Sequence, residues 1–213
     1  MKSRYVWAAF ILLVLLTYKI PATALYVDLN CTNPIAPYIS WDTAATNLQQ
    51  AATIASSGDT ILVTNGIYKY GNAPGSRISV LNNVTVKSVN GPAVTIIKGA
   101  WDAATNGPNA LRCVYLASGS VLSGFTLTNG ATPTSGLNSG GGVYCASTNC
   151  VVTNCIIVGN AADASGGGAF LGTLVNCVLA GNSALRLNTG SGGGAASSVL
   201  TNCVIAGNIV AYI

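Results

Sequence analysis

Ser139-Gly140-Gly141-Gly142-Val143 returns twice along this chain, as Ser165-Gly166-Gly167-Gly168-Ala169 and as Ser191-Gly192-Gly193-Gly194-Ala195, each copy 26 residues after the last. A second signature, Asn-Cys-x-x-x-Gly-Asn, lies between and after these copies, at Asn154–Asn160, Asn176–Asn182 and Asn202–Asn208. Its copies are 22 and 26 residues apart, so the repeated unit varies in length. Such self-similarity is typical of a solenoid, in which loops vary on a constant frame of strands.

The Asn-Cys signature predicts a bend between two short strands of each coil. Aligned with it are two weaker upstream copies, Leu81–Val86 and Leu122–Leu127. Only Asn and Gly, which tolerate a left-handed backbone, occur in the resulting column. Its members are Asn83, Gly124, Asn154, Asn176 and Asn202.

Alternation after the bend assigns side chains to the two faces of the strand. The first inward column is expected to hold Val84, Phe125, Cys155, Cys177 and Cys203, and the second Val86, Leu127, Ile157, Leu179 and Ile205. The outward position between them is Thr85 and Thr126 in the early coils, then Ile156, Val178 and Val204. A solvated face does not need that later apolar stripe, so the stripe is expected to lie under a loop or to bind a partner.

The composition also favours short strands joined by tight turns. Charged residues make up 7% of the chain and Gly is abundant, which does not suit a disordered segment. Together these features predict an all-β, right-handed parallel β-helix.

The first coil needs a cover, and the stretch from Asp42 to Ala55 is expected to supply it. Asp42 or Thr43 is suited to cap a helix, and Leu48, Ala51, Ala52 and Ala55 share one helical face. Strand-like Thr60–Thr64 follows the Gly58-Asp59 turn, and the coils are expected to begin there.

The last unit stops at Ile213, before a further glycine signature. We therefore expect that the β-helix domain, residues 25–213, is truncated at its C-terminal end, or that a partner covers its last coil.

The first 24 residues have the pattern of a secretory signal peptide. Lys2 and Arg4 precede an apolar run, Val6–Leu16, and Ala22-Thr23-Ala24 supplies a small-x-small site, so cleavage is expected after Ala24. The alternative, a membrane anchor, is disfavoured because the run is shorter than the roughly 20 residues that span a bilayer. Localisation is therefore predicted to be secreted, or at the cell surface or outer membrane.

Removing the signal lowers the net charge from +4 to +1, because three cations leave and all five acids remain. A near-neutral chain has no basic footprint for nucleic acid. We expect a polysaccharide or surface-protein partner, no nucleic acid, no membrane span in the mature chain, and end-to-end or side-by-side association.

All seven cysteines follow the predicted signal, so they meet an oxidising compartment and, being odd in number, leave at least one without a partner in the chain. Stacked Cys155, Cys177 and Cys203 are expected to form a buried thiol ladder, because parallel Cβ vectors hold the carbons that bear the sulfurs farther apart than the ~3.8 Å that a disulfide prefers. Cys145 with Cys150 is the better disulfide candidate, and Cys31 with Cys113 is a further one.

From Asn47 through Gly58-Asp59-Thr60 to Gly66-Ile67-Tyr68, the sequence resembles the opening of pectin-lyase-like right-handed β-helix proteins. The Gly-Gly-Gly-Ala and Asn-Cys-x-x-x-Gly-Asn repeats are similar to those of polymorphic outer membrane proteins. The resemblance covers about residues 42–208 and implies a fold. It does not imply an activity, because this fold carries lyases, hydrolases and adhesins alike.

The residues themselves disfavour several activities. A glycoside hydrolase needs two carboxylates flanking the scissile bond, but the chain has no Glu and its Asp residues are not paired in sequence. The absence of His removes His-based triads. The glycine triplets are not followed by Gly-Lys-Ser/Thr and so do not match a phosphate loop.

A polysaccharide lyase is the alternative that stays open, since it needs a base and a cation to neutralise the substrate carboxylate. The residues on offer are Lys87, Lys98, Arg112, Tyr115 and Tyr144. The preferred interpretation is an adhesive or structural β-helix module that can bind carbohydrate, with no catalytic residue, cofactor or metal assigned.

Overall fold

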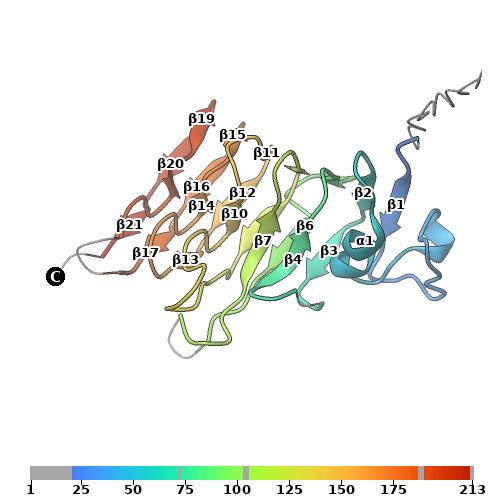
Figure 1. Cartoon of the computed structure of the whole chain (residues 1–213), viewed down its shortest axis with the longest axis horizontal. Helices are drawn as coiled ribbons and strands as arrows, with labels where there is room; N and C mark the ends of the chain where they lie inside the picture. Colours follow the sequence, from blue (N-terminus) through green and yellow to red (C-terminus); the bar gives the residue numbers. More distant parts are fainter. Residues whose placement is uncertain (1–20, 72, 103–105, 187–189, 212–213) are drawn as a thin grey trace, which may run out of the picture.

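The chain winds into coils that stack along one axis, as Figure 1 shows. This computed structural model describes residues 21–71, 73–102, 106–186 and 190–211. Strands of successive coils pair in parallel throughout the four sheets, which we name A, B, C and D. The predicted all-β parallel β-helix is confirmed.

Each coil between the first and the last contributes one strand to sheet A, then one to sheet B, and later one to sheet C. Within the described residues, the first coil contributes a strand to sheet A alone, and the last contributes no strand to sheet C. Sheet A holds β1 (Ala24–Val27), β2 (Thr60–Val63), β5 (Thr85–Ser88), β8 (Val121–Ser123), β11 (Val151–Thr153), β15 (Thr173–Val175) and β19 (Val199–Thr201). Sheet B holds β3 (Gly66–Tyr68), β6 (Thr95–Lys98), β9 (Thr126–Thr128), β12 (Ile156–Val158), β16 (Val178–Ala180) and β20 (Val204–Ala206).

Sheet C is the third sheet that the coils form. It holds β4 (Ser76–Val80), β7 (Arg112–Leu116), β10 (Val143–Cys145), β14 (Ala169–Phe170) and β18 (Ala195–Ala196). Three later coils add a short sheet D before they reach sheet C or the described C-terminus, made of β13 (Ala161–Ala162), β17 (Ser183–Ala184) and β21 (Ile209–Val210).

The bend between sheets A and B is left-handed, as the Asn-Cys signature predicts. Gly124, Asn154, Asn176 and Asn202 have φ values of 81°, 52°, 55° and 50°. The exposed amides of the three asparagines also bond to one another, with Asn202 Nδ2 donating to Asn176 Oδ1 over 2.6 Å. Asn therefore serves both the backbone and the stacking of coils at this corner.

The predicted register of the first coils is wrong. Val86 pairs with Leu122 in sheet A, not with Leu127 in sheet B, so Asn83 and Val84 lie outside the columns of the later bends. The strand that pairs with β9 is β6, because the loop before it is longer than the later bends. Thr85 therefore does not precede Thr126 in the outward column.

The outward apolar stripe on sheet B is accordingly longer than expected. It runs through Ile67, Ile96, Thr126, Ile156, Val178 and Val204, with Thr126 as its one hydroxyl residue. Exposure rises toward both ends of the stripe, to 51% at Ile67 and 58% at Val204.

The core is built from columns of like residues, as expected for stacked coils. Phe125, Cys155 and Cys177 are buried after the bend, and Leu127, Ile157 and Leu179 are fully buried two residues on. Sheet A contributes Ile61, Val86, Leu122, Val152 and Leu174, all with no exposed surface. Each buried aliphatic side chain stabilises the fold by about 1.5–3 kcal/mol.

A helix covers the start of the β-helix, although it begins later than predicted. Helix α1 spans Leu48–Ile54, and its N-cap is Asn47. The Asn47 side chain accepts from the Gln50 backbone nitrogen, and the Gln50 side-chain oxygen accepts from the Asn47 backbone nitrogen. The predicted buried face of α1 is confirmed. Asp42 and Thr43 belong instead to η1 (Trp41–Thr43), a short 3-10 helix whose N-cap is Ser40.

A strand that was not predicted from the sequence precedes this helix. Strand β1 pairs with β2 from Ala24 to Val27, so the coils begin before Thr60. The Thr23 backbone also donates to the Asp59 carboxylate over 2.8 Å. Signal-peptide cleavage after Ala24 would remove Thr23 and Ala24, and with them these contacts. The position of the cleavage site stays a prediction. The charged and apolar parts of the predicted signal lie outside the described residues.

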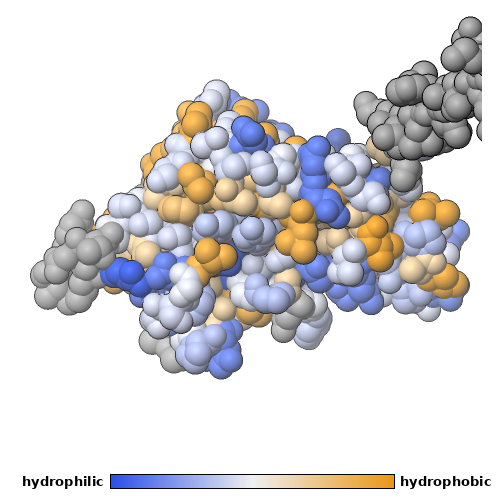
Figure 2. Space-filling view, viewed as in Figure 1, coloured by the Kyte–Doolittle hydropathy of each residue, from blue (hydrophilic) through white to orange (hydrophobic). Residues whose placement is uncertain are grey.

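The two ends of the described β-helix differ. Leu174 and Leu179 are fully buried, whereas the residues that follow them in their columns, Leu200 and Ile205, are 38% and 54% exposed. Apolar side chains are visible over β19 and β20 in Figure 2. Within the described residues, no helix has the length and apolar character needed to cross a membrane.

Candidate functional site

Aromatic side chains stack on the outer face of sheet C. The column that register defines there is Ser79, Tyr115, Tyr144, Phe170 and Ala196. The Tyr115 and Tyr144 ring centroids are 5.6 Å apart with planes 7° from parallel, and those of Tyr144 and Phe170 are 5.3 Å apart at 26°. The three rings therefore stack from one coil to the next along the β-helix axis. We call Tyr115, Tyr144 and Phe170 the aromatic ladder.

A cavity of about 480 Å³ lies where this ladder stops. Volumes of this size are typical of small-ligand sites. The residues around it come from α1, from the loop before β4, from β4 and the residue that follows it, from β7, and from the loop before β10: Gln49, Thr53, Ala73, Pro74, Ser79, Leu81, Arg112, Tyr115 and Leu137. Most of this lining is apolar, with one guanidinium.

The end of the cavity is closed by α1 through a polar contact with the edge of sheet C. Gln49 Oε1 accepts from the Ser79 backbone nitrogen over 2.8 Å, and Gln49 Nε2 donates to the Ser79 carbonyl over 3.5 Å. One amide side chain thus satisfies both backbone groups that a neighbouring strand would otherwise pair. Strand β4 is the end strand of this sheet, and α1 covers its free edge.

Arg112 is the charged group of the site, and it is only 2% exposed. Its Nη2 donates to the carbonyls of Leu137 and, over 3.4 Å, Ser139, and its guanidinium carbon lies 5.4 Å from the Tyr144 ring centroid. Its Nε is buried with no hydrogen-bond partner among the described residues. Among the described residues, the one ion pair joins Arg186 to Asp163. No carboxylate of those residues therefore pairs with Arg112.

This burial has an electrostatic consequence. Desolvation lowers the pKa of Arg112 to about 10, against an opposing effect of the Tyr144 and Tyr115 hydroxyls. The guanidinium remains a cation at neutral pH. Because Arg112 also lines the cavity, its positive charge favours an anionic, oxygen-rich group there over a neutral one.

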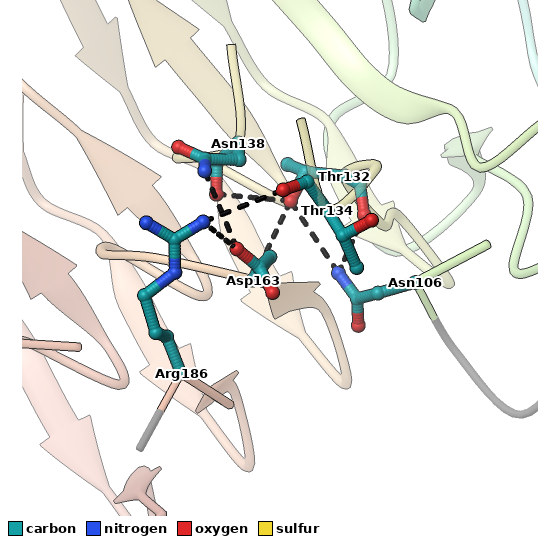
Figure 3. A network of polar contacts seen from close by, with 6 residues as sticks. All are labelled: Asn106, Thr132, Thr134, Asn138, Asp163 and Arg186. Carbon is teal, nitrogen blue, oxygen red and sulfur yellow. Dashed lines mark hydrogen bonds and ion pairs between the residues drawn. The ribbon is translucent and has the colours of Figure 1, made fainter. Parts of the chain in front are cut away.

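The wall that carries Leu137 is fixed by a polar network that joins loops from successive coils (Figure 3). Asn106 Nδ2 donates to the Thr132 carbonyl over 2.6 Å, and the Asp163 backbone donates to Thr132 Oγ1 over 2.9 Å. Asn138 Nδ2 donates to the Asp163 carboxylate, which also pairs with Arg186. Asp163, the one acid of the repeat region, is thus engaged in holding the loop before β10.

The residues suggested for a lyase are divided by the fold. Arg112, Tyr115 and Tyr144 come together on sheet C. Lys87 lies on β5 of sheet A and Lys98 on β6 of sheet B, both exposed. Ser79, Gln49 and Leu137 were not foreseen, because none belongs to a repeated motif.

All seven cysteines are free thiols in the structure. Two separate groups of them have thiols in contact within the group. Cys145 donates to Cys150, which lowers the pKa of Cys150 to about 6 and raises that of Cys145. Their disulfide stays a prediction. In the expected thiol ladder, burial raises the pKa of Cys155. A hydrogen bond from the Cys155 thiol lowers the pKa of Cys177.

The suggested pairing of Cys31 with Cys113 is wrong for this structure. Cys31 lies beside the Asp42 carbonyl in the N-terminal loop. Cys113 is fully buried against the Thr128 carbonyl and the Asn160 side chain, and burial raises its pKa to about 12. The two sulfurs therefore contact different coils.

Comparison with solved structures yields a match to the crystal structure of pectate lyase Pel9A, with a TM-score of 0.56. This chain therefore shares the right-handed parallel β-helix fold of that pectate lyase. The match covers 86% of this chain at 15% sequence identity, a level that establishes the fold alone. This chain spans about half of that protein, 48% of its length. No family model and no curated protein matches the sequence.

Proposed function

We propose that this chain is an exported or cell-surface β-helix module with an adhesive or structural role, which holds acidic carbohydrate in the cavity beside Arg112. The observation that supports this proposal is an arginine only 2% exposed, uncompensated by any carboxylate of the described residues, in an aromatic and apolar cavity. A sugar offers hydroxyls and an apolar ring face, and a uronate adds a carboxylate. Those groups match the cation and the aromatic wall.

The experiment is a calorimetric titration of the purified protein with a galacturonate trimer, with its methyl ester as the uncharged comparison. We expect the acid to bind and the ester to bind at least tenfold more weakly, because only the acid offers a carboxylate to Arg112. Arg112→Gln should weaken binding of the acid at least about 30-fold, the equivalent of about 2 kcal/mol for a buried charged partner.

Lys98→Gln is the matched control, because it removes an exposed cation from sheet B. Its affinity should equal that of the unaltered protein. Equal binding of acid and ester, or equal losses in both variants, would contradict the proposal. Thermal melting of each variant checks that it is folded.

A polysaccharide lyase is the second candidate, because the fold brings Arg112, Tyr115 and Tyr144 together on sheet C. One of these side chains, in its deprotonated form, would remove the proton from the carbon beside the uronate carboxylate. The electron pair of that C–H bond forms the double bond as the bond to the 4-linked sugar breaks, and the departing oxygen takes a proton from water. Incubation with polygalacturonate would then produce the absorbance of unsaturated uronides. A binding module predicts no such product.

A further inference from the structure

The aromatic ladder is incomplete at its first position. Ser79 occupies the place in β4 that Tyr115 occupies in β7, and register puts the two directly opposite each other. Because Tyr144 covers one face of the Tyr115 ring, the other face points toward Ser79. The small side chain at Ser79 therefore leaves a ring-sized space above the sheet.

That space belongs to the cavity beside Arg112. Ser79 and Tyr115 both line it, and Gln49 with Thr53 of α1 close its far side. The two ring contacts of the ladder, at 5.6 and 5.3 Å, show the separation at which a flat group stacks on this sheet. A ring at the same separation from Tyr115 would stand above Ser79, between Tyr115 and α1.

We propose that one uronate ring of the carbohydrate fills this vacant position, with its apolar face stacked on Tyr115 and its carboxylate on Arg112. The inference rests on the proposed function and specifies where and how the sugar is held. Stacking on an aromatic face favours a flat apolar surface, and the charged contact then selects the acidic sugar. Tyr115 and Ser79 thereby become specificity-determining residues.

The test fills the vacant position from within the protein. Ser79→Phe places a ring where the sugar is expected and continues the ladder, without altering the Ser79 backbone groups that bond to Gln49. We expect this variant to bind the galacturonate trimer at least tenfold more weakly and to melt no lower than the unaltered protein. Ser79→Ala is the matched control, which should keep its affinity within about twofold because the space stays open.

Tyr115→Leu gives a second measurement that does not depend on Phe fitting at position 79. It removes the stacking face and should also weaken trimer binding, by about three- to tenfold, the equivalent of ~1 kcal/mol for an aromatic contact. Unchanged affinity in Ser79→Phe and in Tyr115→Leu would overturn the inference while leaving the proposed function intact. Loss of binding in Ser79→Ala equal to that in Ser79→Phe would also overturn it, since the hydroxyl would then be the contact.

Failure of the unaltered protein to bind the trimer is a different result. It would overturn the proposed function, and the assignment of the vacant position to a uronate with it. Arg112→Gln separates the two claims further. That variant should lose the preference for acid over ester, whereas Ser79→Phe should weaken the binding of both.

Discussion

Asparagine has two distinct roles in each repeat, and the difference is one of burial. The asparagines at the bend are exposed, whereas Asn160 and Asn182, which follow the next glycine, are buried. Asn182 Oδ1 accepts from the backbone and side-chain nitrogens of Asn160, both over 3.0 Å, and Asn182 Nδ2 donates to the Ile157 carbonyl over 2.9 Å. Asn208 repeats this arrangement toward Asn182. The buried amides therefore connect coils where no strand pairing does.

Asn182→Ala should lower the free energy of unfolding by about 1–3 kcal/mol. It leaves the Asn160 backbone nitrogen without its acceptor in the interior, and such a group costs about 1–3 kcal/mol. Chemical denaturation measures the change.

Asn176→Gly is the control, since it removes an exposed amide and keeps a backbone with positive φ. Asn176→Gly should lower the free energy of unfolding by less than about 1 kcal/mol. Equal losses in the two variants would contradict the distinction between the buried and exposed asparagines.

The sequence predicts only part of this residue-level chemistry. The bend asparagines were predictable, because a column restricted to Asn and Gly implies a left-handed backbone. The buried asparagines stand in the same motif, yet alternation does not show that they turn inward after a positive-φ glycine such as Gly181. Arg112 was visible as a candidate, but its burial depends on a loop from the next coil.

At the scale of elements, the glycine triplets form rows in which backbones of neighbouring coils approach closely. The backbones of these rows bond coil to coil, as when the Gly142 nitrogen donates to the Gly167 carbonyl over 3.1 Å. A methyl group added at Gly167 would overlap the carbonyl oxygens of Ser183 and Gly193. The triplets are therefore a packing device, in agreement with the absence of a phosphate-loop motif from the sequence.

Gly167→Ala should destabilise the protein by about 3 kcal/mol, because backbone atoms on both sides cannot give way easily. Gly181→Ala is the matched comparison, since a methyl group there meets no atom within 4 Å and φ is +59°. It should cost about 1 kcal/mol of backbone strain alone. Denaturation midpoints compare the two, and an equal or larger loss at Gly181 would contradict close packing of the rows.

Element boundaries were predicted well where the repeat is regular and poorly where it is not. Strands β12, β16 and β20 follow the signature residue for residue. The first coils lack the signature and have longer connections, so a motif-based alignment moved Val86 from sheet A to sheet B. The cavity lies in this irregular part, which is why its walls were not foreseen.

For the whole molecule, the candidate site lies near the capped end of the β-helix. Helix α1 contacts β1, β2 and β4, and so covers the first coil while it closes the cavity. The opposite end carries the exposed Leu200 and Ile205. One short helix thus serves both the stability of the fold and the shape of the site.

The global architecture was the most predictable level, because a repeat of coil length leaves few folds to choose from. The chemistry was the least predictable, since it needs residues from separate coils, such as Gln49, Ser79 and Arg112, to meet beside a gap in a column. Likeness to a pectate lyase at 15% identity supplies the fold and leaves the ligand to experiment.

The most direct test is a crystal structure of the protein with the galacturonate trimer bound. We expect one sugar ring stacked on Tyr115 above Ser79, with its carboxylate within hydrogen-bond distance of the Arg112 guanidinium. A trimer bound on another sheet, or a cavity that stays free of sugar at saturating trimer, would contradict the proposed mode of binding.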